Sequence, residues 1–237
     1  MSAVAVASDE VLDRAELLAG VRYERRAGSV VLRLDPAWQV LSSAVLGGGR
    51  RHARSLLHLH VPLTYRGDRP ERDLRAAARA LDLGGPVVGL MTAVDLARTQ
   101  ILSGVAEGCA VRVLVTVGLR NASRPGERPV PAGPGTINAM VLVDGRLREA
   151  AAVELAALLA EAKAAALVES GLRTPSGARA SGTSTDAVAV LWRPTAGREL
   201  RHAGAATELG ALAGAIIGAA IGTELERRSG ADEGGRA

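Results

Sequence analysis

Short apolar segments separated by glycine, proline and polar residues run through the first two thirds of the chain and recur near residue 190. Segments that are rich in Val and Leu and bounded by turn-forming residues are typical of strands. We expect strands at residues 29–34, 38–46, 56–61, 86–94, 99–106, 109–119, 136–143 and 186–192. Because Glu107-Gly108 separates two of them, residues 99–119 are predicted to form a hairpin.

Three other segments carry apolar residues at helical spacing. Residues 71–83 end at Gly84-Gly85-Pro86, a sequence that stops a helix. The longest pattern covers residues 147–169. Between residues 155 and 168 only Glu161 and Lys163 interrupt its Ala, Leu and Val residues, so this helix is predicted to be buried on nearly all sides. The last helix is expected at residues 207–226.

Four glycines spaced four apart share one face of this last helix: Gly210, Gly214, Gly218 and Gly222. Each lowers the stability of the helix by about 1 kcal/mol relative to alanine. We therefore expect this face to pack tightly against a neighbouring element of the core.

These elements predict a single α+β domain with a mixed or largely antiparallel sheet and packed helices, because adjacent strands outnumber strand–helix alternations. An α/β fold is the alternative, since the C-terminal half does alternate. The predicted domain covers residues 29–226. Residues 1–28 are expected to form an N-terminal extension, and residues 227–237 a disordered tail.

Composition argues against several classes of protein. The formal charge is only +4 and the basic residues are scattered, which argues against nucleic-acid binding. The longest apolar run, residues 209–222, has 14 residues, fewer than the ~20 that span a membrane. Cys109 is the only cysteine and acidic residues stand where a signal peptide would begin. We therefore expect a cytoplasmic protein without disulfides.

Lys163 is the only lysine among 29 Lys and Arg residues. Its amine is compact and can lose a proton when buried, which a guanidinium cannot do. We therefore expect Lys163 to perform a role that arginine cannot. Glu161 lies about 200° away around the helix, so the two do not pair. Asp186 is the expected partner of Lys163, and a hydroxyl or backbone donor that of Glu161.

A dense hydroxyl cluster, Ser181-Gly182-Thr183-Ser184-Thr185-Asp186, precedes the last predicted strand. Such a cluster is suited to hold an amide or to present a hydroxyl nucleophile. A turn whose hydroxyls satisfy backbone donors has the same pattern. Further polar residues stand at or near other strand ends: Ser42, Ser43, Thr92, Asp95, Asn121 and Asn138.

His58 and His60 lie two apart, hence on the same side of a strand, as two metal ligands would. The spacing of the other residues provides no third ligand. We therefore interpret both as ordinary strand histidines and predict no metal site.

Ordered motifs over residues 35–225 resemble those of the adenosylcobinamide amidohydrolases of corrinoid salvage. The motifs are Leu41-Ser42-Ser43-Ala44-Val45 with Gly47-Gly48-Gly49, His60-Val61-Pro62, Val88-Gly89-Leu90-Met91-Thr92-Ala93, Thr116-Val117-Gly118-Leu119 with Asn121-Ala122, Gly135-Thr136-Ile137-Asn138, Glu161-Ala162-Lys163, Gly182-Thr183-Ser184-Thr185-Asp186 and Thr207-Glu208-Leu209-Gly210. Ala180-Ser181 stands where the family pattern has Ala-Thr, which keeps a hydroxyl.

The resemblance implies that residues 29–226 form an amidohydrolase domain. Its substrate would be the corrinoid adenosylcobinamide, whose aminopropanol amide is hydrolysed to give adenosylcobyric acid for cobamide salvage. No enzyme cofactor is expected, because the cobalt belongs to the substrate. Two alternatives remain: a corrinoid-binding module without turnover, and an amidohydrolase of another substrate.

Amide hydrolysis requires an attacking oxygen, a base and donors for the oxyanion, and two mechanisms follow. In the first, Lys163, with Asp186, activates the hydroxyl of Ser184 or Thr183, and an asparagine donates to the oxyanion. In the second, Glu161 or Asp186 activates water and the hydroxyls bind corrin amides. The expected substrate-binding residues are Ser42, Ser43, Thr92, Asp95, Asn121, Asn138 and Thr185. We expect one cavity to be lined by Ser42, Thr92, Asn121, Asn138, Lys163 and Asp186.

Overall fold

The computed structural model of the protein describes residues 11–128, 135–195 and 197–234. Its main sheet contains β1 (Val11–Leu18), β2 (Val21–Arg26), β3 (Ser29–Ser42), β4 (Gly49–His60), β5 (Val87–Thr92), β6 (Gln100–Ala106), β7 (Cys109–Val117), β9 (Ile137–Val143) and β12 (Ala187–Trp192). Two small sheets pair β8 (Ala122–Ser123) with β11 (Gly182–Thr183), and β10 (Arg146–Leu147) with β13 (Glu199–Leu200). The helices are α1 (Pro70–Ala80), the short 3-10 helix η1 (Leu96–Arg98), α2 (Glu149–Glu169) and α3 (Glu208–Gly234).

The main sheet is mixed and curls around its own interior. Its strand order is β1-β2-β3-β12-β9-β7-β6, and β4 pairs β3 and β5 off this path. The β4–β5 and β12–β9 pairs are parallel, whereas the other pairs are antiparallel. The predicted single α+β domain with a mixed sheet is therefore confirmed, as is the hairpin of β6 and β7.

The long strand β3 joins the two halves of the sheet. The sequence predicts two strands here, but residues 29–42 form one strand whose register shifts between Arg33 and Trp38. β4 follows one edge of β3, while β2 and then β12 share the other edge. This shared strand allows the sheet to turn from one half into the other.

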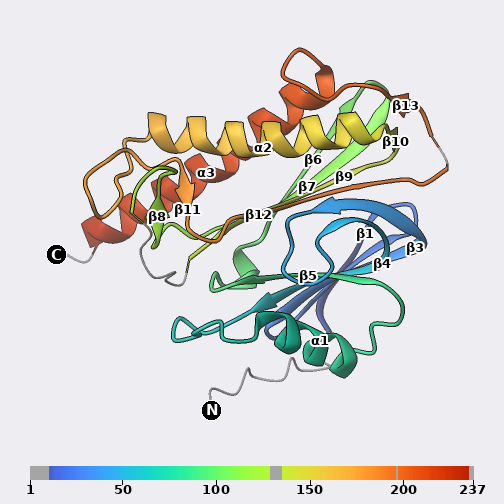
Figure 1. Cartoon of the computed structure of the whole chain (residues 1–237), viewed down its shortest axis with the longest axis horizontal. Helices are drawn as coiled ribbons and strands as arrows, with labels where there is room; N and C mark the ends of the chain where they lie inside the picture. Colours follow the sequence, from blue (N-terminus) through green and yellow to red (C-terminus); the bar gives the residue numbers. More distant parts are fainter. Residues whose placement is uncertain (1–10, 129–134, 196, 235–237) are drawn as a thin grey trace.

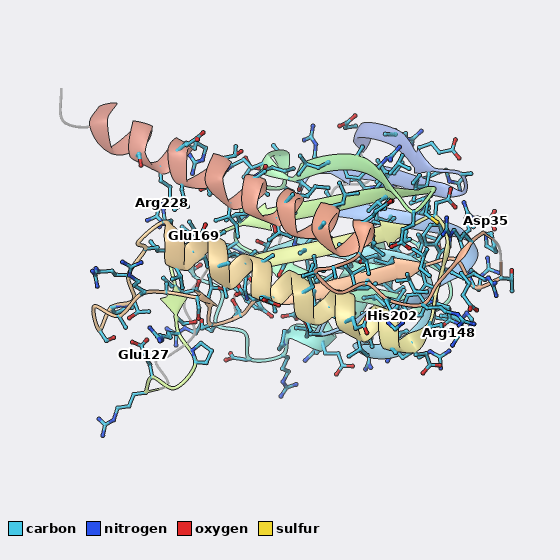
Figure 2. The ribbon with its side chains drawn as sticks, turned by 90° about the horizontal axis from the view of Figure 1, so that it is seen from above. Asp35, Glu127, Arg148, Glu169, His202 and Arg228 are labelled. Atoms are coloured by element: carbon cyan, nitrogen blue, oxygen red, sulfur yellow. The ribbon has the colours of Figure 1, made fainter. Side chains whose placement is uncertain are left out.

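Three apolar clusters hold the layers together. One fills the interior of the curled sheet around Trp38 and Met140. A second joins the sheet to α2 and α3, which lie side by side on one face, and a third lies beneath α1 on the opposite side (Figures 1 and 2). On β9 the alternation of a strand sends Met140 into the interior and Val141 toward the helices, so both faces are buried.

Both ends of the domain differ from the sequence prediction. The hairpin of β1 and β2 extends the sheet upstream of residue 29, and α3 continues past residue 226 to Gly234. The hairpin sequence looks irregular because most of the described β1 side chains, such as Asp13 and Glu16, are exposed at the edge of the sheet. Residues 1–10 and 235–237 of the predicted extension and tail lie outside the described residues.

Helix α2 is exposed on one face, so the prediction of burial on nearly all sides is wrong. Val153 is 58% exposed, and Ala157, Ala160, Glu161 and Ala165 follow on the same face. Alanine is common in helices because of its intrinsic helix propensity. An alanine-rich stretch therefore cannot distinguish a solvent-facing side from a core-facing one by hydrophobic pattern.

Helix α3 is long and apolar enough to cross a membrane by length and composition alone. The segment Glu208–Ser229 has 22 residues and a mean hydropathy of 1.4, although 44% of this window is buried within the protein. Ala213, Ile217 and Ile221 of α3 lie in the cluster shared with the sheet and α2. Such packing is that of a core helix, and the absence of a membrane anchor stays a prediction.

The glycines of α3 have two different environments. A Cβ at Gly210 would lie 2.1 Å from the carbonyl oxygen of Gly204, and one at Gly214 would touch Ala162 of α2 at 3.8 Å. A Cβ at Gly218 or Gly222 would have no neighbour within 4 Å. The predicted tight packing therefore holds at Gly210, becomes ordinary contact at Gly214, and does not hold at the last two positions.

We expect Gly218→Ala to raise the free energy of unfolding by about 0.5–1 kcal/mol, because alanine favours the helix and has room there. Gly210→Ala is the matched variant on the same face, and it should lower stability because its Cβ would collide with backbone. Urea unfolding of both variants tests the contrast. Equal effects of the two substitutions would contradict it.

Candidate active site

Polar side chains gather at one end of the curled sheet, where its apolar interior opens. His58 and His60 come from the end of β4, and Thr92 ends β5 beside His60 in the parallel register. Asn138 lies near the start of β9, paired with Ala187 at the start of β12. Strands distant in sequence therefore present imidazole, hydroxyl and amide groups at the same mouth.

His58 is fully buried and bound to Asn138. Its Nε2 lies 2.9 Å from Asn138 Nδ2, and the same amide nitrogen donates to the Met91 carbonyl at 2.8 Å. Burial, with a smaller effect from His60, lowers the pKa of His58 to about 3. Neutral His58 must accept at Nε2, which assigns its proton to Nδ1. This bonded, buried histidine matches the interpretation of an ordinary strand histidine.

We expect His58 to make the protein less stable as the pH falls. Its pKa is about 3 when folded and near 6.5 when unfolded, so the unfolded chain binds the extra proton between these values. The free energy of unfolding should lose up to about 1.4 kcal/mol per pH unit from this group as the pH falls below 6.5. Above pH 6.5 the effect vanishes because both states are neutral.

Urea unfolding between pH 4 and 7 of the wild type and of His58→Gln tests this expectation. The variant should have the shallower pH dependence, whatever its absolute stability. His52→Gln, which replaces an exposed histidine of the same strand, should retain the wild-type slope. Parallel curves for wild type and His58→Gln would contradict a buried neutral His58.

A cavity of about 290 Å³ opens at this mouth and is lined by hydroxyls and an amide. Thr92, Thr136, Asn138 and Thr185 contribute its polar groups. The Thr136 hydroxyl donates to the Thr185 carbonyl at 2.7 Å, and the Thr185 hydroxyl donates to the Gly135 carbonyl at 2.8 Å. These bonds hold the two threonines in fixed positions on the wall of the cavity.

A larger cavity of about 1040 Å³ adjoins the smaller one, because Ala93 and Gly135 line both. His60 and Asp95 face it from the end of β4 and the cap of η1. The Asp95 side chain accepts from Ala97 N through Oδ1 at 2.9 Å, and the residue is exposed. An imidazole and a carboxylate therefore border the larger cavity next to the hydroxyls of the smaller one.

Asn121 and Ser184 stand behind the shared wall. The Asn121 Nδ2 donates to Ser184 Oγ at 2.8 Å and approaches Thr185 Oγ1 at 3.4 Å. A Cβ at Gly135 would lie 2.6 Å from Asn121 Oδ1, and Gly135 has a φ of +148°. Glycine is therefore required where the two cavities meet.

Lys163 and Asp186 form the ion pair that the sequence predicted, with 2.5 Å between Nζ and Oδ2. Asp186 also accepts from Ile137 N and Thr183 N, each at 2.9 Å, and from the Thr183 hydroxyl. A Cβ at Gly182 would lie 2.7 Å from Asp186 Oδ2, so only glycine fits beside the pair. Asp186 therefore ties α2, β9 and the hydroxyl cluster together.

The structure brings only some of the predicted site residues to the two cavities. Thr92, Asn138 and Thr185 line the smaller cavity and Asp95 the larger one, while Asn121 and Ser184 support their shared wall. The others do not line either cavity: Ser42, Ser43, Glu161, Lys163, Thr183 and Asp186. Of the six residues expected to line one cavity, only Thr92 and Asn138 do so, and Asn121 lies beside that cavity.

The remaining predicted residues have identifiable positions. Ser42 Oγ donates to the Val188 carbonyl at 3.0 Å, and Ser43 Oγ accepts from Val188 N at 3.0 Å, so both fasten the start of β12. Glu161 lies on the exposed face of α2. Some of the predicted polar residues therefore hydrogen-bond to backbone groups and stabilise the fold, while others line the cavities.

Sequence reasoning did not select two polar residues of the cavities, Thr136 of the smaller one and His60 of the larger one. The spacing of His58 and His60 is typical of metal ligands, but the two side chains have different surroundings. His58 is buried beneath Asn138, whereas His60 is half-buried and borders the larger cavity. The available signal was its place at the end of a strand, directly before Val61-Pro62.

Fold and site together define a class: a single-domain α+β protein that offers hydroxyls, an amide, an imidazole and a carboxylate to a large small-molecule ligand. The sequence model of the adenosylcobinamide amidohydrolase family matches residues 13–233 of this chain. The chain therefore belongs to that family, and the predicted resemblance and enzyme class, amide carbon–nitrogen hydrolysis, are confirmed.

Two relatives bear the same description. The adenosylcobinamide amidohydrolase of Methanosarcina mazei is 31% identical over 198 residues, which cover 80% of this chain and 90% of the relative. That of Halobacterium salinarum is 34% identical over 146 residues, 55% of this chain and 60% of the relative.

Proposed function

We propose that the protein hydrolyses the amide that joins the aminopropanol arm to the corrin ring of adenosylcobinamide. Water adds across the carbon–nitrogen bond, leaving the carboxyl group of adenosylcobyric acid on the ring and releasing aminopropanol. The observation that carries the proposal is the pair of adjoining cavities in a member of this family. The larger has room for bulky parts of a corrinoid, and the smaller has polar groups for one amide.

Water activated in the larger cavity is the mechanism that the geometry favours. His60 and Asp95 border that cavity, and imidazole is the commonest group for proton transfer at neutral pH. We assign His60 to take the proton of the attacking water, and Thr136 and Thr185 to bind the amide. This keeps the second mechanism predicted from sequence, with His60 and Asp95 in place of Glu161 and Asp186.

The reason for this replacement is the surroundings of the two acids. Asp186 accepts from four donors and so is occupied in holding the hydroxyl cluster. Glu161 faces outward from α2. The first mechanism, with Lys163 activating Ser184 or Thr183, stays a prediction, and Lys163 is assigned here to position Thr185 through Asp186.

The test is incubation of the purified protein with adenosylcobinamide, followed by mass spectrometry of the products. We expect adenosylcobyric acid and aminopropanol in equal amounts. Binding of the corrinoid without release of aminopropanol would instead identify a binding module. Hydrolysis of other amides in preference to the corrinoid, measured by competition, would identify a different amidohydrolase. The expected cytoplasmic location belongs to the same proposal.

We expect hydrolysis to survive a strong chelator. Among the described residues, no three His, Cys, Asp or Glu side chains gather as a metal site would require. Dialysis against EDTA should therefore leave turnover essentially unchanged. The cobalt of the substrate belongs to the corrinoid and is not an enzyme metal. Activity lost on dialysis and restored by zinc would contradict this expectation and would make His58 and His60 candidate metal ligands.

A further inference from the structure

Strand β6 forms one edge of the main sheet, and its outer side has no strand partner among the described residues. It pairs with β7 through all 7 of its residues without a register shift, so this edge is regular. None of these residues is charged: Gln100-Ile101-Leu102-Ser103-Gly104-Val105-Ala106. Sheet edges that stay unpaired usually carry charges, prolines or bulges, because free backbone groups bind another strand readily. β6 has none of these protections.

The opposite edge of the sheet is protected in the usual way. β1 ends the strand order on that side and pairs only with β2 within the described part of the chain. Asp13, Arg14 and Glu16 are exposed on β1, and its register with β2 shifts twice. The two edges therefore differ in the features that prevent association, and β6 is the edge that is open to another strand.

Apolar side chains of β6 extend the interior of the curled sheet to this open edge. Ile101 pairs with Leu114 of β7, so the two side chains lie on the same face. Leu114 is fully buried in the interior cluster, whereas Ile101 is 38% exposed. Val105, two pairs further along on the same face, is 72% exposed. The apolar interior thus continues onto β6, where the described residues leave its side chains open to solvent.

We propose that β6 pairs with β6 of a second copy of this chain, antiparallel and about a two-fold axis at Ser103. This register aligns the full length of both strands. It places Ile101 opposite Val105 of the partner subunit, and Val105 opposite the partner's Ile101. The strand has the same apolar–polar–apolar pattern from either end, so it is complementary to itself, as a two-fold interface requires. The two sheets become continuous, and the exposed apolar side chains become cross-strand pairs.

Helix α3 fits the same arrangement. It runs along β6 in the opposite direction, because Leu212 lies against Gly104, and Gln100 Nε2 donates to the Ala220 carbonyl at 2.9 Å. Since α3 also packs on β7, the two copies of α3 lie about two strand spacings apart across the two-fold axis, roughly 10 Å. Neighbouring helices pack at about 8–10 Å, so the strand pairing brings the helices into contact.

The side of α3 that faces the partner is small and uncharged. Ala215 and Ala219 are exposed and lie on the same side of the helix as Leu212. Helix α2 packs against another side of α3, at Gly214 (Figure 2). Alanine side chains allow two helices to touch at this separation. Strand pairing and helix packing therefore favour the same two-fold axis.

This dimer does not depend on the proposed function. None of the residues of β6 lines either of the two cavities described above. Association through β6 therefore leaves both cavities of each copy open.

The first experiment is sedimentation equilibrium of the purified protein over a roughly 100-fold range of micromolar concentrations, where we expect a dimer. Val105→Lys should raise the dissociation constant about 100-fold or more, because an unpaired ammonium then enters the interface twice. Val153→Lys, at a residue 58% exposed on α2, is the control and should keep the wild-type constant. Thermal unfolding verifies that each variant is folded. A monomeric wild type, or a dimer that Val105→Lys does not weaken, would overturn the proposal.

The second experiment tests the register by mixing variants. In the proposed register, Val105→Lys and Ile101→Glu copies form a heterodimer in which the introduced lysine and glutamate are directly opposite, while the second pair stays apolar. This mixture should dimerise at least about 10-fold more tightly than either variant alone. Val105→Lys mixed with Val105→Glu is the matched control, because the two introduced charges are not opposite and no recovery is expected. Equal recovery in both mixtures, or none in the first, would contradict pairing about Ser103.

Discussion

Replacing Asp186 by alanine is expected to lower the free energy of unfolding by about 3 kcal/mol, the lower end of the range for breaking one side of a buried ion pair, because this pair is part-buried. The substitution leaves the Lys163 ammonium without its counterion and removes the acceptor of Ile137 N and Thr183 N. The side chains of Lys163 and Asp186 are only 18% and 12% exposed, so water replaces these contacts poorly. Urea unfolding of the purified variant measures the loss.

Two matched variants distinguish this role from the general effect of removing a charge. Lys163→Met should be less destabilising than Asp186→Ala, because Asp186 retains three hydrogen-bond donors. Asp95→Ala removes an exposed carboxylate that accepts one backbone hydrogen bond, so we expect the free energy of unfolding to fall by only about 0.5–2 kcal/mol. Stability of Asp186→Ala within 1 kcal/mol of the wild type would show that the connection between α2, β9 and the hydroxyl cluster is not important for the fold.

Replacing His60 by glutamine is expected to lower kcat/KM for adenosylcobinamide by about 10²- to 10⁴-fold, the usual range for a general acid–base group. Glutamine preserves hydrogen bonding but cannot take a proton from water. His60 is half-buried at the end of β4 and borders a cavity, so the substitution should leave the core intact. The measurement combines steady-state kinetics with corrinoid titration, and binding should change far less than turnover.

The control is His52→Gln, which replaces an exposed histidine of the same strand and should keep normal kinetics. Near-normal turnover of His60→Gln would remove the proposed base and favour the mechanism in which Lys163 activates a hydroxyl. In that case a folded Lys163→Arg enzyme should lose about 10²-fold or more in turnover, since guanidinium does not give up a proton at neutral pH.

Local sequence patterns were sufficient to predict most of the helices and strands. Alternation and turn residues predicted the hairpin of β6 and β7, and helical spacing with the Gly84-Gly85-Pro86 stop predicted α1. These signals are local, because the side-chain periodicity of a helix or strand is visible in a few consecutive residues. The pattern did not predict that β3 is one strand, since the partners that continue it, β4 and β12, come later in the chain.

The candidate site was predictable only in part. The scarcity of a polar residue type indicates that a residue is unusual, but it does not indicate which contacts the residue makes. Lys163 and Asp186 were recognised as partners from the rarity of lysine and the cost of an unpaired charge. Asn138 was recognised as unusual, yet both hydrogens of its amide are used by His58 and Met91. Those contacts span 80 and 47 residues of sequence, so no local pattern contains them.

The family, the α+β class and the residues able to do polar chemistry follow from residue type and from order along the chain. Which of those residues line a cavity depends on how distant strands pack together. Thr92, Asn138 and Thr185 line a cavity because β5 ends, β9 begins and the turn before β12 lies at one mouth of the curled sheet. Exposure was decided in the same way: the alanines of α2 divide between core and solvent according to what packs against them, a property that long-range contacts set and residue type does not.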